Sequence, residues 1–352
     1  MRTSVVLTLV ALVTAACHGS MGPRTVPADR FNYNEMISLS AKQQLLTNLI
    51  RMRYIEAPSF VEISSMIDQF GREGQVNGGL GWGTGIPLGA DTQQLGAAAR
   101  WTDRPTITYT PVTGQEFARS LLTPLTPESL FALVQAGWPA EALLGLTVRS
   151  INGHENETAA PAARGQADPA FWEVLSIWKR LRGKGALSLR LDKQEGKRNV
   201  IVFSKTKADD PEVMQDLARM TELLSLSGDN EYTMSYGLIP EEDQIAILSR
   251  STLEILANLA WYFDVPPKHV AEGRTGPAFE SKLSRVPTID VKYSCERPKC
   301  PFVAVKNRGY WFYIEDTDVQ SKRVFLILEF MMTLTDHGDA ARGPIVSIGG
   351  GG

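Results

Sequence analysis

Two cysteines, Cys295 and Cys300, are the closest pair of thiols in the sequence, with four residues between them. Such a pair either forms a disulfide or supplies half of a zinc site. A zinc site needs two further ligands, and the histidines of the chain are not paired at metal-ligand spacing. We therefore predict a Cys295–Cys300 disulfide, contributing roughly 2 kcal/mol, and no metal or cofactor.

The chain has four histidines, and beyond His18 a serine-type triad would need His154, His269 or His337 as its base. The sequence has no Gly-x-Ser-x-Gly, His-Glu-x-x-His or P-loop motif. Gly81-x-Gly83-x-Gly85 lacks the strand and helix that flank a nucleotide-binding loop. His337 follows a predicted helix, where the helix dipole favours an imidazolium. We therefore expect no catalytic residue.

Two clusters of acidic residues are candidates for a cation site or for a structural role. Glu315-Asp316-Thr317-Asp318 has the oxygen ligands that a divalent cation prefers. It also precedes an apolar helix, and capping of that helix by Asp318 is the simpler interpretation. Glu241-Glu242-Asp243 lies between two predicted strands and is expected to form a solvated turn.

Aromatic residues give a weaker indication of a binding surface. Tyr310 to Tyr313 places two aromatics on each face of one predicted strand. Trp311 and Tyr313 would either meet a protein or glycan partner or lie buried beneath helices. Trp82, in a glycine-rich stretch, is included with them as a possible partner surface.

The first sixteen residues have the order of an export signal. Arg2 precedes an apolar run from Val5 to Ala15, which is shorter than the roughly 20 residues that cross a bilayer. The following Thr14-Ala15-Ala16-Cys17 resembles the lipobox of bacterial lipoproteins, although an aliphatic residue is usual where Thr14 stands. The resemblance implies removal of residues 1–16 and attachment of diacylglyceryl and palmitoyl groups to Cys17. Ordinary cleavage after Ala15 or Ala16, giving a soluble periplasmic protein, stays an alternative.

The residue after Cys17 bears on location. By the same resemblance to Gram-negative lipoproteins, an aspartate there favours the inner membrane, so His18 favours the outer membrane. Residues 17–30 contain glycine, proline and polar residues and are predicted to form a flexible tether. We therefore expect an outer-membrane lipoprotein, anchored by its lipid and facing the periplasm.

The composition describes a globular chain and excludes one class of partner. Hydrophobic residues make up 43% and charged residues 21% of the 352 residues, as in folded domains. The net charge of −3 gives no electrostatic grounds for binding nucleic acid. The partners that we expect are therefore the membrane, through the lipid, and either another protein or further copies of this chain.

Residues 31–144 are predicted to hold an N-terminal helix, a glycine-rich β-hairpin and a helical segment. Asn32 and Glu35 form a capping box for a helix from Tyr33 to Tyr54. Residues 71–96 are rich in glycine and lie between alternating flanks, as in a twisted or mobile hairpin. Later helices are predicted directly after the capping residues Thr126, Asp168, Asp210, Ser251 and Asp318.

The order of the remaining elements predicts an α+β fold. Strand, helix, strand, strand, helix, strand occurs over residues 145–240, and again over residues 241–352 with an added hairpin. This order is typical of the ferredoxin-like split βαβ sandwich. We therefore predict two tandem sandwiches with a boundary between residues 240 and 241, the last strand being Ile345–Ile348.

Several short stretches, Tyr33-Asn34, Gln43-x-Leu45-Leu46-x-Asn48, Arg51-x-Arg53-Tyr54 and Arg104–Pro111, are similar to those of bacterial lipoproteins whose activity is uncharacterised. The resemblance implies a location and no mechanism. We therefore expect a non-enzymatic structural, assembly or accessory-binding role in the cell envelope. A hydrolase acting on glycan or peptide, or a lipoprotein that binds a small molecule, are the alternatives.

Overall fold

A computed structural model describes residues 26–335, except 68–69, 81–92, 104–105, 113–114, 193–197, 204–209, 228–230 and 284–285. Several predicted features lie outside the described residues: the export signal, Cys17, His18, Gly81-x-Gly83-x-Gly85, Trp82, His337 and the strand Ile345–Ile348. The chain divides into two compact units. Unit 1 comprises residues 1–38, 61–112 and 344–352, and unit 2 comprises residues 39–60 and 113–343.

Helix α2 (Val26–Arg53) is the first described element, and it begins before the predicted cap at Asn32. The apolar side chains along this helix fall into two groups. The second group is buried in unit 2 and consists of Leu45, Leu46, Leu49 and Ile50, whereas Met36 in the first group is 60% exposed. The apolar side chains of the last turns thus fix the helix in the core, as burial of about 1.5–3 kcal/mol per large aliphatic side chain explains.

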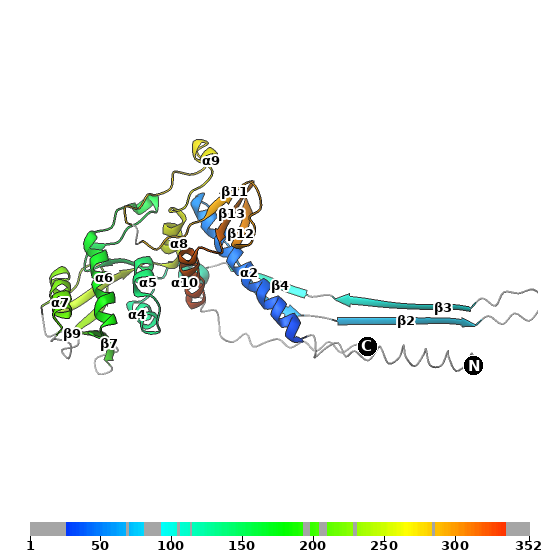
Figure 1. The fold of residues 1–352 in the computed structure, drawn as a ribbon, viewed down its shortest axis with the longest axis horizontal. Helices are drawn as coiled ribbons and strands as arrows, with labels where there is room; N and C mark the ends of the chain where they lie inside the picture. The colour runs from blue at the N-terminus through cyan, green and yellow to red at the C-terminus, as the bar shows by residue number, and fades with distance from the viewer. Residues whose placement is uncertain are drawn as a thin grey trace, which may run out of the picture. The chain divides into compact units, whose positions relative to one another are not determined.

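Unit 1 holds two pairs of strands, of which β2–β3 is antiparallel. β1 (Phe60–Ile67) pairs with β4 (Thr106–Val112), and β2 (Phe70–Leu80) pairs with β3 (Gln93–Asp103). The β-hairpin predicted for the glycine-rich stretch is confirmed in its described residues, with β2 and β3 as its two strands. β2 and β3 are the long pair of arrows in Figure 1.

Unit 2 is built on a six-stranded sheet in the order β6-β5-β10-β9-β8-β7. The strands are β5 (Val148–Ile151), β6 (His154–Glu155), β7 (Leu187–Asp192), β8 (Arg198–Phe203), β9 (Glu231–Tyr236) and β10 (Gln244–Ser249). β10 runs parallel to β9, and the remaining neighbours are antiparallel. Alternating burial along β9 shows that one face of the sheet meets the core.

Helices supply the rest of that core. They are α3 (Gln115–Leu122), α4 (Pro127–Gln135), α5 (Ala140–Thr147), α6 (Pro169–Gly183) and α7 (Pro211–Leu223). α6 buries seven apolar or aromatic side chains. Its Trp178 ring lies 4.9 Å from the Phe131 ring of α4. Gly145 of α5 lies so close to Trp172 that a Cβ there would be 2.5 Å from the indole, so α5 and α6 pack tightly at a glycine.

A second, three-stranded sheet has the order β11-β13-β12, with β11 (Lys292–Ser294), β12 (Pro301–Asn307) and β13 (Tyr310–Glu315). A tight turn at Arg308 and Gly309, which both have positive φ, joins β12 to β13 as the added hairpin. The accompanying helices are α8 (Thr252–Ala260), α9 (Pro267–Ala271) and α10 (Val319–Thr335).

The predicted caps of the later helices are confirmed, whereas Asn32 lies inside α2. Side chains of Thr126, Asp168, Asp210 and Ser251 accept backbone N–H groups at the starts of α4, α6, α7 and α8. Asp318 accepts the Ser321 N–H at 3.0 Å. Caps are local interactions within four residues, so sequence alone locates them.

The molecule is a mixed α/β protein, but the two tandem sandwiches are not confirmed. The elements follow the predicted order, yet β10, assigned to the second copy, lies between β5 and β9 of the first. The predicted boundary at residue 240 thus falls within one sheet. The cause is that apolar patterning identifies strands but does not specify their neighbours; the buried Ile245 and Ile247 make β10 an interior strand.

Two finer expectations also differ. α10 was predicted to be buried all round, but Leu326 is 56% and Phe330 is 36% exposed, so only one side meets the core. Three helices, α3, α5 and α9, were not predicted. For α5 the reason is that it lies within an apolar run whose pattern is equally compatible with a strand.

Candidate functional site

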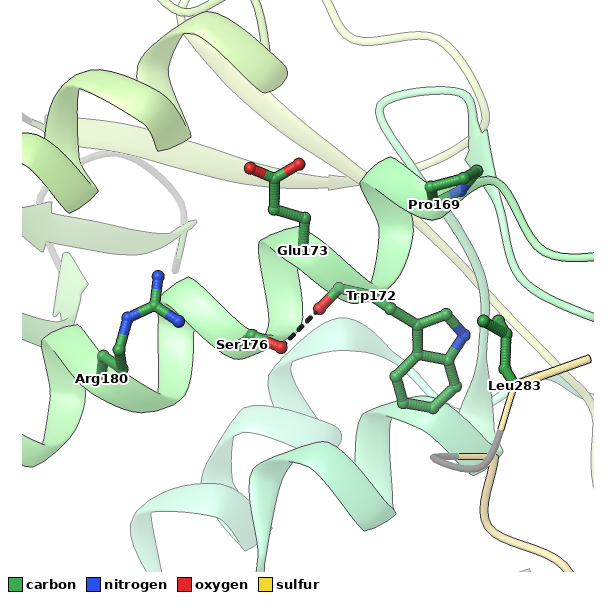
Figure 2. Close-up of a pocket in the computed structure, with 6 residues that line it drawn as sticks. All are labelled: Pro169, Trp172, Glu173, Ser176, Arg180 and Leu283. Atoms are coloured by element: carbon green, nitrogen blue, oxygen red, sulfur yellow. Dashed lines mark hydrogen bonds between the residues drawn. The ribbon is translucent and has the colours of Figure 1, made fainter.

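The pocket of unit 2 in Figure 2 has a volume of about 360 Å³ and opens beside α6. Six residues line it: Pro169, Trp172, Glu173, Ser176, Arg180 and Leu283. Trp172 and Leu283 form its apolar end, and Glu173 and Arg180 carry its charges. The lining thus consists of one tryptophan, one proline, one leucine and about two turns of polar helix surface.

The charged groups of this pocket are engaged with α7. Arg219 donates to both carboxylate oxygens of Glu173, at 2.7 and 3.0 Å. Arg180 makes the equivalent two-pronged contact with Asp216, at 2.9 and 2.6 Å. Ser176 donates to the Trp172 carbonyl at 2.8 Å, as helical serines do. These groups hold α6 against α7, and the pocket lining contains no nucleophile beside a general base.

His154 joins three elements instead of acting as a free base. Its Nδ1 lies 2.7 Å from Asp168 Oδ2 at the start of α6, and its Nε2 lies 2.8 Å from the Leu223 carbonyl at the end of α7. An ionised carboxylate and a carbonyl can only accept, so both ring nitrogens donate and the ring is an imidazolium. Burial opposes that charge, but the two hydrogen bonds outweigh it and raise the pKa of His154.

His269 is also structural. It is 3% exposed, and its Nδ1 lies 2.6 Å from the Tyr54 hydroxyl. Burial lowers the pKa of His269 below its ordinary value, so the ring is neutral and packs edge-on against Tyr54 and Tyr310. Neither described histidine contacts a serine or cysteine in a catalytic arrangement.

Two buried arginines tie distant segments together. Arg53, fully buried, donates to the Phe263 carbonyl at 3.2 Å, to Thr275 Oγ1 at 2.6 Å and to the Gly276 carbonyl at 2.9 Å. Its guanidinium lies 4.5 Å from the Trp261 ring centre. Burial lowers the pKa of Arg53 to about 10, so it stays charged at neutral pH.

Arg250 occupies a second buried polar cluster, with Glu157, Asn258 and Tyr262. It donates to the carbonyls of Glu157 at 2.5 Å and Leu146 at 3.2 Å. The Glu157 side chain accepts from the Tyr262 hydroxyl at 2.9 Å, while its Oε2 has no hydrogen-bond partner among the described residues. Burial raises the pKa of Tyr262. Sequence reasoning missed both arginines, because a single arginine in a helix or loop gives no sign of its burial.

The acidic clusters fill structural roles. Lys292 binds Glu315 at 3.0 Å, Lys322 binds Asp316 at 2.8 Å, and Asp318 caps α10. Capping, which the sequence favoured over cation binding, is thus confirmed. Among the described residues, no group of three histidine, cysteine or acidic side chains is placed to hold a metal ion.

The predicted disulfide is absent, and Cys295 and Cys300 are exposed free thiols. The topology of the second sheet explains this. Ser294 ends β11 and Pro301 begins β12, on opposite sides of β13, so they are about 10 Å apart across the sheet. Ser294 is opposite Trp311 and Pro301 is opposite Glu315, and these two positions of β13 are four residues apart, which adds about 13 Å along the strand. A disulfide needs Cα atoms within about 7 Å.

Trp311 and Tyr313 share one face of β13 and are half-buried, whereas Phe312 and Ile314 on the other face are buried. The Arg297 guanidinium lies 5.5 Å from the Trp311 ring centre. The strand is therefore buried on one side only, and its second face is partly covered by the chain itself.

The β2–β3 hairpin of unit 1 is the remaining candidate. Eleven consecutive residue pairs join its strands, from Phe70 opposite Asp103 to Leu80 opposite Gln93. In the sheets that the structure describes, each of these strands pairs only with the other. The outer edge of each strand therefore presents a row of backbone N–H and C=O groups without a ladder partner.

Comparison with protein-family models, with curated proteins and with solved structures gives no match. Within the described part of the chain, no helix is long and apolar enough to cross a membrane.

Proposed function

We propose that the protein is a non-enzymatic lipoprotein of the bacterial outer membrane that assembles with copies of itself through the β2–β3 hairpin. The observation that carries the proposal is the eleven-pair ladder with two outer edges. Isolated two-stranded hairpins are marginally stable in water. Pairing with the same hairpin in neighbouring copies satisfies the edges of every strand.

The location rests on the N-terminus. The short apolar run that ends in Ala15-Ala16-Cys17 supports lipid attachment at Cys17, and His18 supports the outer membrane. A lipid anchor holds all copies at one surface, which raises their effective concentration and favours weak edge-to-edge contacts.

The non-enzymatic assignment rests on unit 2. Its buried arginines, its two described histidines and the ion pairs beside its pocket all hold elements together. These contacts are structural, so the proposal assigns no reaction to unit 2. The proposed role in assembly comes from the outer edges of β2 and β3.

A shortened hairpin tests the proposal. Gly74 and Ala99 are opposite one another, so replacing residues 75–98 with Asn-Gly closes the ladder early with a favoured two-residue turn. We expect this variant to lose assembly, measured by light scattering in detergent. Unit 2 is untouched, and its unfolding temperature should not change.

The matched control removes residues outside the described ladder. Replacing residues 81–92 with Asn-Gly joins Leu80 to Gln93, which are also opposite one another, and keeps all eleven pairs. This control should assemble as the full chain does. Equal assembly of the ladder-shortened variant and the full chain would contradict the proposal.

A further inference from the structure

The residue pairs of the β2–β3 ladder divide the hairpin into two faces. Successive residues of a strand alternate between faces, and directly opposite residues share a face. One face, called here the apolar face, includes the pairs Gly74–Ala99, Val76–Ala97 and Gly78–Leu95. None of these six residues is polar.

The opposite face, called here the polar face, has a different composition. It is made of five pairs: Gly71–Thr102, Glu73–Arg100, Gln75–Ala98, Asn77–Gly96 and Gly79–Gln94. Each pair contains at least one polar residue, and Glu73 is at the register position opposite Arg100. The hairpin is therefore apolar on one side and polar on the other along its middle.

We propose that the apolar face of β2–β3 contacts the acyl chains of a lipid bilayer. This rests on the proposed assembly, because a strand in lipid needs a hydrogen-bonding partner at each edge. Neighbouring copies of the hairpin supply those partners, and the polar face then lies on the side away from lipid.

The length of the ladder fits a bilayer. Each strand has eleven residues, and a strand that crosses the hydrocarbon core at a tilt needs about 9–11. At about 3.3 Å per residue the strands extend about 36 Å, and the three apolar pairs from Gly74 to Gly78 occupy about 13 Å in the middle of that length. The apolar face therefore contacts lipid over the middle of the ladder.

The ends of the apolar face also fit. The charged residues on this face, Arg72 and Asp103, belong to the two pairs nearest β1 and β4, and Gln93 belongs to the last pair at the other end. The two aromatic residues of the hairpin strands, Phe70 and Trp101, share those first two pairs. Aromatic residues typically flank the apolar band where it meets the lipid headgroups.

Two neighbouring alanines allow a matched test. Ala97 lies on the apolar face and Ala98 on the polar face. Ala97→Cys and Ala98→Cys are made in a Cys295→Ser, Cys300→Ser background, labelled with an environment-sensitive fluorophore, and reconstituted as full lipidated chains. The vesicles contain phosphatidylcholine and phosphatidylglycerol, with a nitroxide on the acyl chains of part of the lipid.

We expect the nitroxide to quench the label at position 97 severalfold more than the label at position 98, and aqueous iodide to do the reverse. Leu95→Cys and Gly96→Cys form a second pair with the same expected contrast. Each variant is first checked for the unfolding temperature of unit 2. Equal acyl-chain quenching within both pairs, or none at positions 95 and 97, would overturn the lipid contact.

Failure of the assembly proposal is seen separately. A chain that is monomeric by light scattering contradicts assembly whatever the quenching. A chain that assembles but shows no quenching at position 97 contradicts only the lipid contact.

Discussion

His154 shows how a single side chain carries a pH dependence in this protein. Its imidazolium bridges Asp168 and the last carbonyl of α7. Because the pKa of His154 is raised on folding, its contribution to stability is complete below the unfolded value, near pH 6.5. That contribution is lost as the pH rises through the folded value.

We predict that His154→Gln lowers the free energy of unfolding by roughly 1 kcal/mol at pH 5.5, and by less at pH 8.5. The matched control is Asn152→Gly, which removes two uncharged hydrogen bonds, one donated to the Leu224 carbonyl at the same helix end and one accepted from the Ala246 N–H. Glycine suits the φ of +46° at this position. The loss from Asn152→Gly should be the same at both pH values. A His154→Gln loss that does not change with pH would refute the charged bridge.

Cys295 and Cys300 are a second case at this scale, where sequence and structure disagree. The spacing favoured a disulfide, but β13 separates the strands that carry the two residues. We predict that the unreduced, freshly isolated protein takes up two alkyl groups on these cysteines, measured by mass spectrometry of the peptide that contains them. Recovery of that peptide two hydrogen masses lighter and unalkylated would show that the thiols are joined.

At the scale of elements, the sequence was sufficient to locate four helix starts but not to identify which strands pair with one another. Thr126, Asp168, Asp210 and Ser251 located four helix starts, because a cap and its N–H donor lie within four residues. The position of β10 between β5 and β9 depends on contacts far apart in sequence. The glycine-rich hairpin was predicted, but its register of eleven residue pairs was not, because glycines give no alternating pattern that fixes which residues lie opposite one another.

The same distinction applies to Gly145 and Gly183, two glycines in helices. A Cβ at Gly145 would lie 2.5 Å from Trp172 Cη2, whereas one at Gly183 meets nothing within 4 Å. We predict that Gly145→Ala destabilises the protein by about 1–3 kcal/mol, because the indole must move. Gly183→Ala should cause no loss, since alanine favours helix. Chemical denaturation of both variants gives the comparison, and equal stability of the two would show that α5 and α6 are not in close contact.

At the scale of the whole molecule, the sequence predicted an outer-membrane location and a glycine-rich hairpin. The two faces of that hairpin could be assigned only from the residue pairs of the β2–β3 ladder. Val76 and Ala97 are assigned to one face only once their pairing is known, because a shift of one residue exchanges the faces. The buried Arg53 and Arg250 carry no pattern by which the sequence could reveal them. Their partners are carbonyls that only the complete fold brings together.

Lipid attachment belongs to this scale as well. We predict that Cys17→Ser, which removes the acylated thiol, blocks lipid attachment and the removal of residues 1–16, measured by intact mass. Cys300→Ser serves as the control for loss of a thiol and should be acylated and processed as the full chain is. Normal processing of the Cys17→Ser protein would contradict the anchor.

The central claim, that copies of this chain assemble through the β2–β3 hairpin, is tested most directly by the molar mass of the full chain. Light scattering of the detergent-solubilised protein, with the detergent contribution subtracted, gives the number of chains per particle. The proposed edge pairing predicts a mass of several chains, which the ladder-shortened variant reduces to one. A full-length protein that is a single chain at every concentration, in detergent and in buffer, would contradict the claim.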